Sequence, residues 1–209
     1  FIPHKLEANR IYPFEINSDS TLTIGLHSCG PLSTYIVESK PKHLLNFGCC
    51  YHKMQNEYNI SDISKRNPVL FTNHALTMAA KCLGTNTVLD IETKHLVKRF
   101  RYPIHFYQVD NKDVNIAPLG NAKASDYQSD FKSYINKYCP ELKDFNIPLK
   151  ESEVDYYFKA GSIRALLGRL IEIYIILDRV LYLRENNLDA KVFQFFNPKL
   201  SPRNLGIIV

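Results

Sequence analysis

The first clear pattern of apolar residues lies near the start of the chain. Residues 21–27 (TLTIGLH) are rich in β-branched and aliphatic side chains and stop at the turn-forming SCGP of 28–31, which predicts a buried strand ending in a sharp loop. A short helix fits 32–39, and 43–50 (HLLNFGCC) is a second apolar run of the same kind. A strand, a short crossover helix and a second strand are typical of a βαβ unit with parallel strands.

Helical patterns follow in the middle of the chain. We expect one helix over 68–83, a second over 92–109 that Pro103 interrupts, and a third around the aromatic residues of 127–135. The most periodic segment is 162–185, which predicts a long core helix. Its expected apolar face comprises Ile163, Leu166, Leu167, Leu170, Ile171, Tyr174, Leu177, Val180 and Leu181.

The chain ends in two short apolar runs separated by a turn. Residues 191–196 and 205–209 each predict a strand, and the Asn-Pro of 197–198 begins the turn between them. Together they predict a terminal β-hairpin. We therefore expect one domain over 21–209 and read 1–20, with two prolines and no period, as a linking segment.

Composition narrows the class of protein. The chain has 209 residues, of which 45% are hydrophobic and 22% charged, as expected for a globular domain. Its net charge of +5 permits an anionic partner such as RNA but is too small to demonstrate one. The most apolar stretch, 163–183, carries five charged residues, so we expect a soluble protein with no membrane partner.

The cysteines argue for a reducing compartment. There are five, two of them adjacent, which does not suit a secreted disulfide framework. No apolar signal segment follows Phe1, and because the chain does not begin with Met we expect further residues of the gene product to precede it. We predict a cytoplasmic location, with a mitochondrial one left open.

Chemistry-bearing residues collect after the two predicted strands. Because parallel strands deliver their carboxyl ends to one edge of the sheet, where ligands bind in open α/β sheets, 27–30 and 49–52 would lie together. These are His27, Cys29 and Gly30 on one side, and Cys49, Cys50, Tyr51 and His52 on the other. The alternative is a satisfied histidine beside small buried thiols.

Three segments carry a resemblance to a known family. They are GLHSCG at 25–30, GCCYH at 48–52 and SPRN at 201–204. They resemble the Leu-His-Thr-Cys-Gly-Asp loop, the Cys-Cys-Tyr segment and the C-terminal Ser-Pro-Arg of the methyltransferase-like protein 25 family, whose pattern 176–183 of the long helix also fits. A more distant similarity is to transfer RNA 2′-O-methyltransferases.

The resemblance implies an α/β fold of the Rossmann-like methyltransferase type that uses S-adenosylmethionine. The chain would form the C-terminal half of the sheet, with parallel strands, a terminal antiparallel hairpin and helical insertions. The Gly-x-Gly turn that holds the cofactor in this class occurs nowhere in the sequence. We therefore expect the N-terminal half of the domain, or another chain, to complete the sheet, since an unpaired parallel edge strand is an aggregation hazard.

The resemblance also suggests roles for individual residues. His27 and Cys29 would be catalytic, His27 and Gly30 would contact the cofactor, and Cys50, Tyr51 and His52 would line the acceptor site. Pro31 replaces an acidic residue of the family, so any role of that carboxylate is lost here. The predicted activity is methyl transfer to RNA or to a translation-associated protein. The alternative is an inactive methyltransferase fold that serves as a binding module.

A zinc site at the same edge is a further alternative, although we assign no metal from the sequence. Histidine and cysteine are ligands that zinc prefers. However, the chain has no Cys-x-x-Cys pair, and adjacent residues in a strand point to opposite faces. At most one of Cys49 and Cys50 would then join a given site.

Three other groups have both functional and structural interpretations. Asp178 and Arg179 are interpreted as an ion pair on the surface of the long helix, and Arg203 as a structural residue of a turn. A basic cluster with interleaved aromatic residues would suit RNA, or would be a solvated helix face. It comprises Lys94, His95, Lys98, Arg99, Phe100, Arg101 and Tyr102.

Overall fold

The structure is a computed structural model that describes residues 18–81, 88–111, 122–197, 200–201 and 203–209. Most of the predicted linking segment 1–20 therefore lies outside the described residues. The chain divides into two compact units. The first takes the residues up to Thr85 together with Ile163–Val209, and the second takes Asn86–Ser162. The second unit is helical, in agreement with the expected helical insertion.

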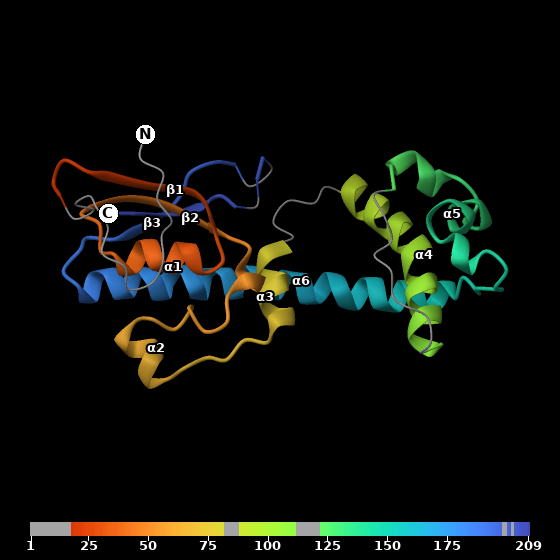
Figure 1. The fold of residues 1–209 in the computed structure, drawn as a ribbon, viewed down its shortest axis with the longest axis horizontal. Helices are drawn as coiled ribbons and strands as arrows, with labels where there is room; N and C mark the ends of the chain where they lie inside the picture. Colours follow the sequence, from red (N-terminus) through yellow and green to blue (C-terminus); the bar gives the residue numbers. More distant parts are fainter. Residues whose placement is uncertain (1–17, 82–87, 112–121, 198–199, 202) are drawn as a thin grey trace. The chain divides into compact units, whose positions relative to one another are not determined.

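A mixed four-stranded sheet organises the first unit (Figure 1). Strands β1 and β2 are parallel, whereas β4 runs antiparallel to both β2 and β3, in the order β1-β2-β4-β3. The predicted βαβ unit and the terminal hairpin are confirmed. The bounds are β1 (Leu22–Cys29), β2 (His43–Cys49), β3 (Lys191–Gln194) and β4 (Leu205–Ile208).

Helix α1 (Pro31–Glu38) and the C-terminal part of α6 (Glu151–Glu185) lie against one face of this sheet (Figure 1). Burial of aliphatic side chains between these layers is the main stabilising contribution in the first unit. The core includes Val37, Leu44, Ile176, Leu183 and Ile207, each at most 3% exposed. Proline at the first helical position suits the start of α1, because that position has no intrahelical N–H partner.

Helix α6 differs from its prediction in both length and orientation. It begins at Glu151 rather than near residue 162. Six residues of its predicted core face are more than one-third exposed: Ile163, Leu166, Leu167, Leu170, Leu177 and Leu181. The buried face instead carries Glu172, Ile175, Ile176, Arg179 and Leu183, at spacings of three or four residues. The two charged residues of this face, Glu172 and Arg179, form hydrogen bonds with other side chains, which offsets the cost of burying them.

Two shorter helices precede the insertion. Helix α3 spans Asn73–Lys81, so the predicted helix 68–83 starts later than expected, and residues 82–83 lie outside the described residues. Helix α2 (Asp62–Arg66) was not predicted. Its start is marked by Ser61, whose side chain accepts a hydrogen bond from the Ser64 N–H as an N-cap.

The second unit is built around a core of aromatic and aliphatic side chains. Helix α4 spans Val88–Asp110 and continues through Pro103, which was expected to interrupt it, whereas α5 (Phe131–Tyr138) is the predicted third helix. Outside the core, a hydrogen bond from the Lys137 ammonium lowers the pKa of Asp126 to about 2. The core residues are Phe100, Ile104, Tyr127, Tyr134, Ile135, Cys139, Leu142 and Ile147.

No helix in the described part of the chain is long and apolar enough to span a membrane.

Candidate functional site

A β-bulge near the end of β1 sets the direction of the predicted site residues. Gly25 pairs with Asn46 and Ser28 pairs with Gly48, so two residues of β1 lie opposite the single residue between them on β2. The bulge reverses the alternation of side chains, because an extra residue shifts the following ones to the other face. Consequently Ser28 is buried, whereas His27 is exposed and shares a side of the sheet with Cys29.

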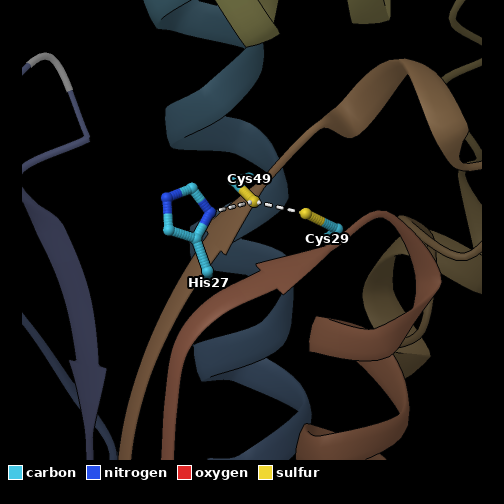
Figure 2. Close-up of side chains that lie close together, drawn as sticks. All are labelled: His27, Cys29 and Cys49. Atoms are coloured by element: carbon cyan, nitrogen blue, oxygen red, sulfur yellow. Dashed lines mark hydrogen bonds between the residues drawn. The ribbon is translucent and has the colours of Figure 1, made fainter.

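Three of these side chains meet at the carboxyl ends of the parallel strands (Figure 2). Cys29 and Cys49 are register partners on β1 and β2, and their Sγ atoms lie 3.0 Å apart. The His27 Nδ1 lies 3.1 Å from the Cys49 Sγ on its other side. The predicted convergence of the two strand ends is therefore present in the structure, and it centres on Cys49.

Cys50 joins the same cluster, contrary to the expectation from strand alternation. Its Sγ lies 3.5 Å from that of Cys29. The strand ends at Cys49, and Cys50 has a left-handed backbone with φ 51° and ψ 44°. This turn brings its side chain back to the side that Cys49 occupies. The rule that adjacent strand residues diverge does not apply, because Cys50 is not in the strand.

The thiols of the cluster differ in acidity. Burial and the two neighbouring thiols raise the pKa of Cys49 to about 12. The pKa of Cys29 is lowered, mainly by its hydrogen bond with Cys49. Cys49 is buried and Cys29 is half-buried, so the more acidic thiol is also the more accessible.

Position 30 requires glycine, because the loop after β1 approaches the turn after β2 closely there. Its φ of +55° is unfavourable for other residues, and an added Cβ would lie 2.8 Å from the Cβ of Lys53. Its N–H donates a hydrogen bond to the Cys49 carbonyl at 2.8 Å. Gly30 is buried beneath Lys53. Of the two residues predicted to contact a cofactor, His27 is the one with an accessible polar group.

The residues predicted to line the acceptor site separate from one another. His52 is exposed. Tyr51 is only 1% exposed, and its hydroxyl donates to Glu172 Oε1 at 3.3 Å. Burial raises the pKa of the Tyr51 hydroxyl. Its ring contributes to the core of the first unit, so it offers no open face on which an acceptor could stack.

With this geometry in view, the chain was compared with known proteins. It is 23% identical to the human and mouse proteins named "Probable methyltransferase-like protein 25", over 91% of its own length in each case. The chain is thus similar in sequence to proteins named as probable methyltransferases. It spans 37% of the length of these relatives. No protein-family profile and no solved structure matches it.

The first unit also contains a buried polar network that the sequence did not predict. The Glu172 carboxylate accepts hydrogen bonds from Arg169 at 2.6 Å and from Arg203 at 3.3 Å, in addition to that from Tyr51. Arg203 also donates to the Ala79 carbonyl at 2.9 Å, which confirms its structural role. The spacing of Arg169 and Glu172, three apart on a helix, is the signal that would have indicated this pair.

Asp178 and Arg179 are buried, and the prediction of a surface ion pair is wrong. Asp178 accepts hydrogen bonds from the backbone N–H groups of Ile60 and Ser61 and from the Ser61 hydroxyl. Arg179 points elsewhere and donates to Thr34 Oγ1 at 3.1 Å. Its pKa is lowered by burial. Both residues therefore link α6 to other elements of the first unit.

Contacts within the second unit favour the solvated-face interpretation of the basic cluster. The His95 Nε2 lies 2.6 Å from Asp155 Oδ1, and Arg99 pairs with Glu151. Phe100 is buried in the core, so its ring is not available to stack on a base.

Proposed function

We propose that the chain forms the C-terminal part of an S-adenosylmethionine-dependent methyltransferase domain, acting in the cytoplasm on RNA or on a translation-associated protein. The similarity to proteins named as probable methyltransferases, over 91% of the chain, carries this proposal. The arrangement of two parallel strands followed by an antiparallel hairpin supports it, because it suits the C-terminal half of a Rossmann-like methyltransferase sheet. S-adenosylmethionine would supply the methyl group as an electrophilic sulfonium.

The outer edge of β1 supports completion of the sheet from outside these 209 residues. Among the described residues, β1 pairs with β2 on one side and with no strand on the other. Leu22, Ile24 and Leu26 of β1 are each more than half exposed. An N-terminal half of the domain, or a second chain, would pair with this edge and cover these side chains.

His27 is the residue we place at the acceptor. Its Nδ1 faces Cys49, which leaves Nε2 on the other side of an exposed ring. When a nitrogen or hydroxyl acceptor gains the methyl group, the proton it loses would move to Nε2. S-adenosylmethionine, when bound, would supply the methyl group from its sulfonium and would leave as the thioether S-adenosylhomocysteine. Cys29 and the exposed His52 would border the same acceptor.

The first test is calorimetric titration of S-adenosylmethionine and S-adenosylhomocysteine. Both ligands are titrated into the protein expressed from its complete gene and, separately, into the 209-residue chain. We expect binding to the complete protein and little or none to the chain alone, since no Gly-x-Gly turn lies within it. Absence of binding to the folded complete protein would contradict the proposal.

The second test follows the methyl group. Radiolabelled S-adenosylmethionine is incubated with the complete protein and with separate fractions of cellular RNA and of ribosome-associated protein. Label in one fraction identifies the class of acceptor. His27→Ala should reduce the initial rate, whereas His74→Ala, which removes another exposed histidine of the first unit, should leave it unchanged.

The second candidate function is a binding module on an inactive methyltransferase fold. Pro31 favours it, because Pro31 begins α1 at the position where the resembled family carries an acidic residue. This candidate predicts that neither ligand binds and that neither fraction is labelled. The calorimetric titration therefore distinguishes the two functions before an acceptor is known.

A further inference from the structure

We propose that Cys29, Cys49, Cys50 and His27 bind one zinc ion that ties together the carboxyl ends of β1 and β2. Three thiols and one imidazole are a ligand set typical of structural zinc sites. The inference goes beyond the proposed function and does not rest on it, because the four side chains and their positions are independent of any methyl transfer.

The distances suit a small tetrahedral site. The ligand atoms of His27, Cys29 and Cys49 all lie within 4.8 Å of one another, and the Cys50 Sγ is 3.5 Å from that of Cys29. In a tetrahedral zinc site with zinc–sulfur bonds of about 2.3 Å, ligand atoms are about 3.8 Å apart. The sulfur–sulfur distances of 3.0 and 3.5 Å require only small outward movements, whereas the Cys50 Sγ, which lies outside the 4.8 Å group formed by the other three ligand atoms, would also have to turn inward to bind the ion.

Three local features produce this convergence. The bulge in β1 turns His27 to the side of Cys29 (Figure 2), the parallel register places Cys29 opposite Cys49, and the left-handed backbone of Cys50 returns its thiol to the group. A left-handed conformation is unfavourable for a residue with a Cβ, and such residues persist where the surroundings determine them, often at ligand sites. A common ligand gives all three features one cause.

Weak thiol hydrogen bonds or a disulfide explain the cluster less well. The S–H group is a poor donor, so hydrogen bonding gives little reason for three thiols to gather beside an imidazole. A disulfide between Cys29 and Cys49 would leave the turn at Cys50 and the orientation of His27 unexplained. Zinc uses all four groups and prefers sulfur and nitrogen ligands.

The number of protein ligands indicates a structural rather than a hydrolytic ion. Cys49 is buried, Cys29 and Cys50 are half-buried and His27 is exposed, so the ion would enter from the open side and be closed by the imidazole. Four protein ligands leave no position for an activated water. The ion would hold the loops on which Gly30 and the 3₁₀ turn Tyr51–Lys53 lie.

The test measures metal content and coordination in the protein expressed from its complete gene. The protein is purified in reducing, chelator-free buffer, and zinc is measured by inductively coupled plasma mass spectrometry and X-ray absorption. We expect one zinc per chain with three sulfur neighbours and one nitrogen neighbour. Co²⁺ added to the zinc-free protein should give the intense visible bands of tetrahedral coordination and a sulfur-to-cobalt charge-transfer band.

Variants show whether these particular residues bind the ion. His27→Ala alters an exposed side chain, so it should fold and bind Co²⁺ at least about tenfold more weakly. Cys50→Ser should also weaken binding and remove one sulfur neighbour from the absorption spectrum. Cys139→Ala, which removes a buried cysteine of the second unit, is the matched control and should bind normally.

Several results would overturn the proposal. The first is a zinc content far below one per chain together with no tetrahedral Co²⁺ spectrum. The second is a coordination shell of oxygen and nitrogen alone. The third is a Cys29–Cys49 disulfide detected by mass spectrometry in the protein purified in reducing buffer. Equal weakening by Cys139→Ala would overturn it as well. Binding of S-adenosylmethionine is measured in a separate experiment. Failure of the zinc proposal therefore leaves the methyltransferase proposal to be tested by its own result, and the reverse also holds.

Discussion

Replacing Asp178 with alanine should destabilise the first unit strongly. The carboxylate is 3% exposed and accepts three hydrogen bonds. They come from the Ile60 N–H at 2.8 Å, the Ser61 N–H at 3.2 Å and the Ser61 hydroxyl at 2.6 Å. Alanine would leave these donors without a partner and would remove a negative charge that stabilises the buried Arg179 guanidinium.

The magnitude follows from these contacts. Each buried donor left unsatisfied costs about 1–3 kcal/mol, and removing one member of a buried charged network typically costs about 3–5 kcal/mol. Because the Ser61 hydroxyl also bonds to Ser64 and can reorient, we expect about 3–5 kcal/mol for Asp178→Ala. Asp178→Asn retains the shape and one oxygen, but its NH₂ would face an N–H donor, so we expect about 1–3 kcal/mol.

Hydrogen exchange at the Leu44 and Val209 amides, which donate to each other's carbonyls in the sheet and keep these acceptors in the variant, measures this effect. A loss of about 3–5 kcal/mol corresponds to an increase of about 150- to 5,000-fold in exchange through unfolding of this unit. Asp189→Ala is the control, because Asp189 is exposed and pairs only with Lys191 in the described contacts. A destabilisation below about 1 kcal/mol by Asp178→Ala would refute the assignment of these hydrogen bonds.

Three further predictions concern other parts of the fold. Tyr51→Phe removes the hydroxyl that donates to Glu172, and it should lower stability by about 0.5–1.5 kcal/mol, visible as a lower urea midpoint; an unchanged midpoint would argue against this bond. Gly30→Ala places a Cβ against Lys53 at positive φ and should cost about 1–3 kcal/mol by the same assay, whereas a stabilised variant would contradict the backbone assigned to this loop. The pKa of Asp126 is about 2 in the folded state, mainly because of its hydrogen bond from Lys137, and about 3.9 in the unfolded state. The ionised carboxylate therefore stabilises the folded state above about pH 4, and this stabilisation is lost as the pH falls towards 2. The free energies of unfolding of the wild type and of Asp126→Asn, measured as a function of pH, should accordingly differ at neutral pH and converge near pH 2.

Sequence patterns predicted the sheet well because its strands obey simple rules. The runs at 21–27 and 43–50 are apolar and short, and the helix between them fits a parallel crossover. The same reasoning misplaced the buried face of α6. A hydrophobicity scale ranks Glu172, Asp178 and Arg179 as surface residues, and it cannot anticipate the hydrogen-bonding partners that allow them to be buried. Apart from Arg169, which lies three residues before Glu172, those partners are distant in sequence.

The site was predicted in location but not in detail. Strand order alone brings 27–30 beside 49–52, and this was readable from the sequence. Gly25, an isolated glycine within the strand, was an available signal for the bulge that turns His27, whereas no glycine marks the left-handed backbone of Cys50. The side-chain directions that bring His27, Cys29, Cys49 and Cys50 together depend on those two local departures from regular geometry.

The two proposals meet at His27 and constrain each other. If Nδ1 binds zinc, Nε2 carries the ring proton and has no lone pair left with which to accept another. His27 would then orient an acceptor through Nε2 and would not remove its proton. In that case His27→Ala should release zinc and slow methyl transfer together. If zinc is absent, His27→Ala should slow transfer in protein that never held the ion, so metal content and transfer rate measured on the same samples distinguish the two roles of the imidazole.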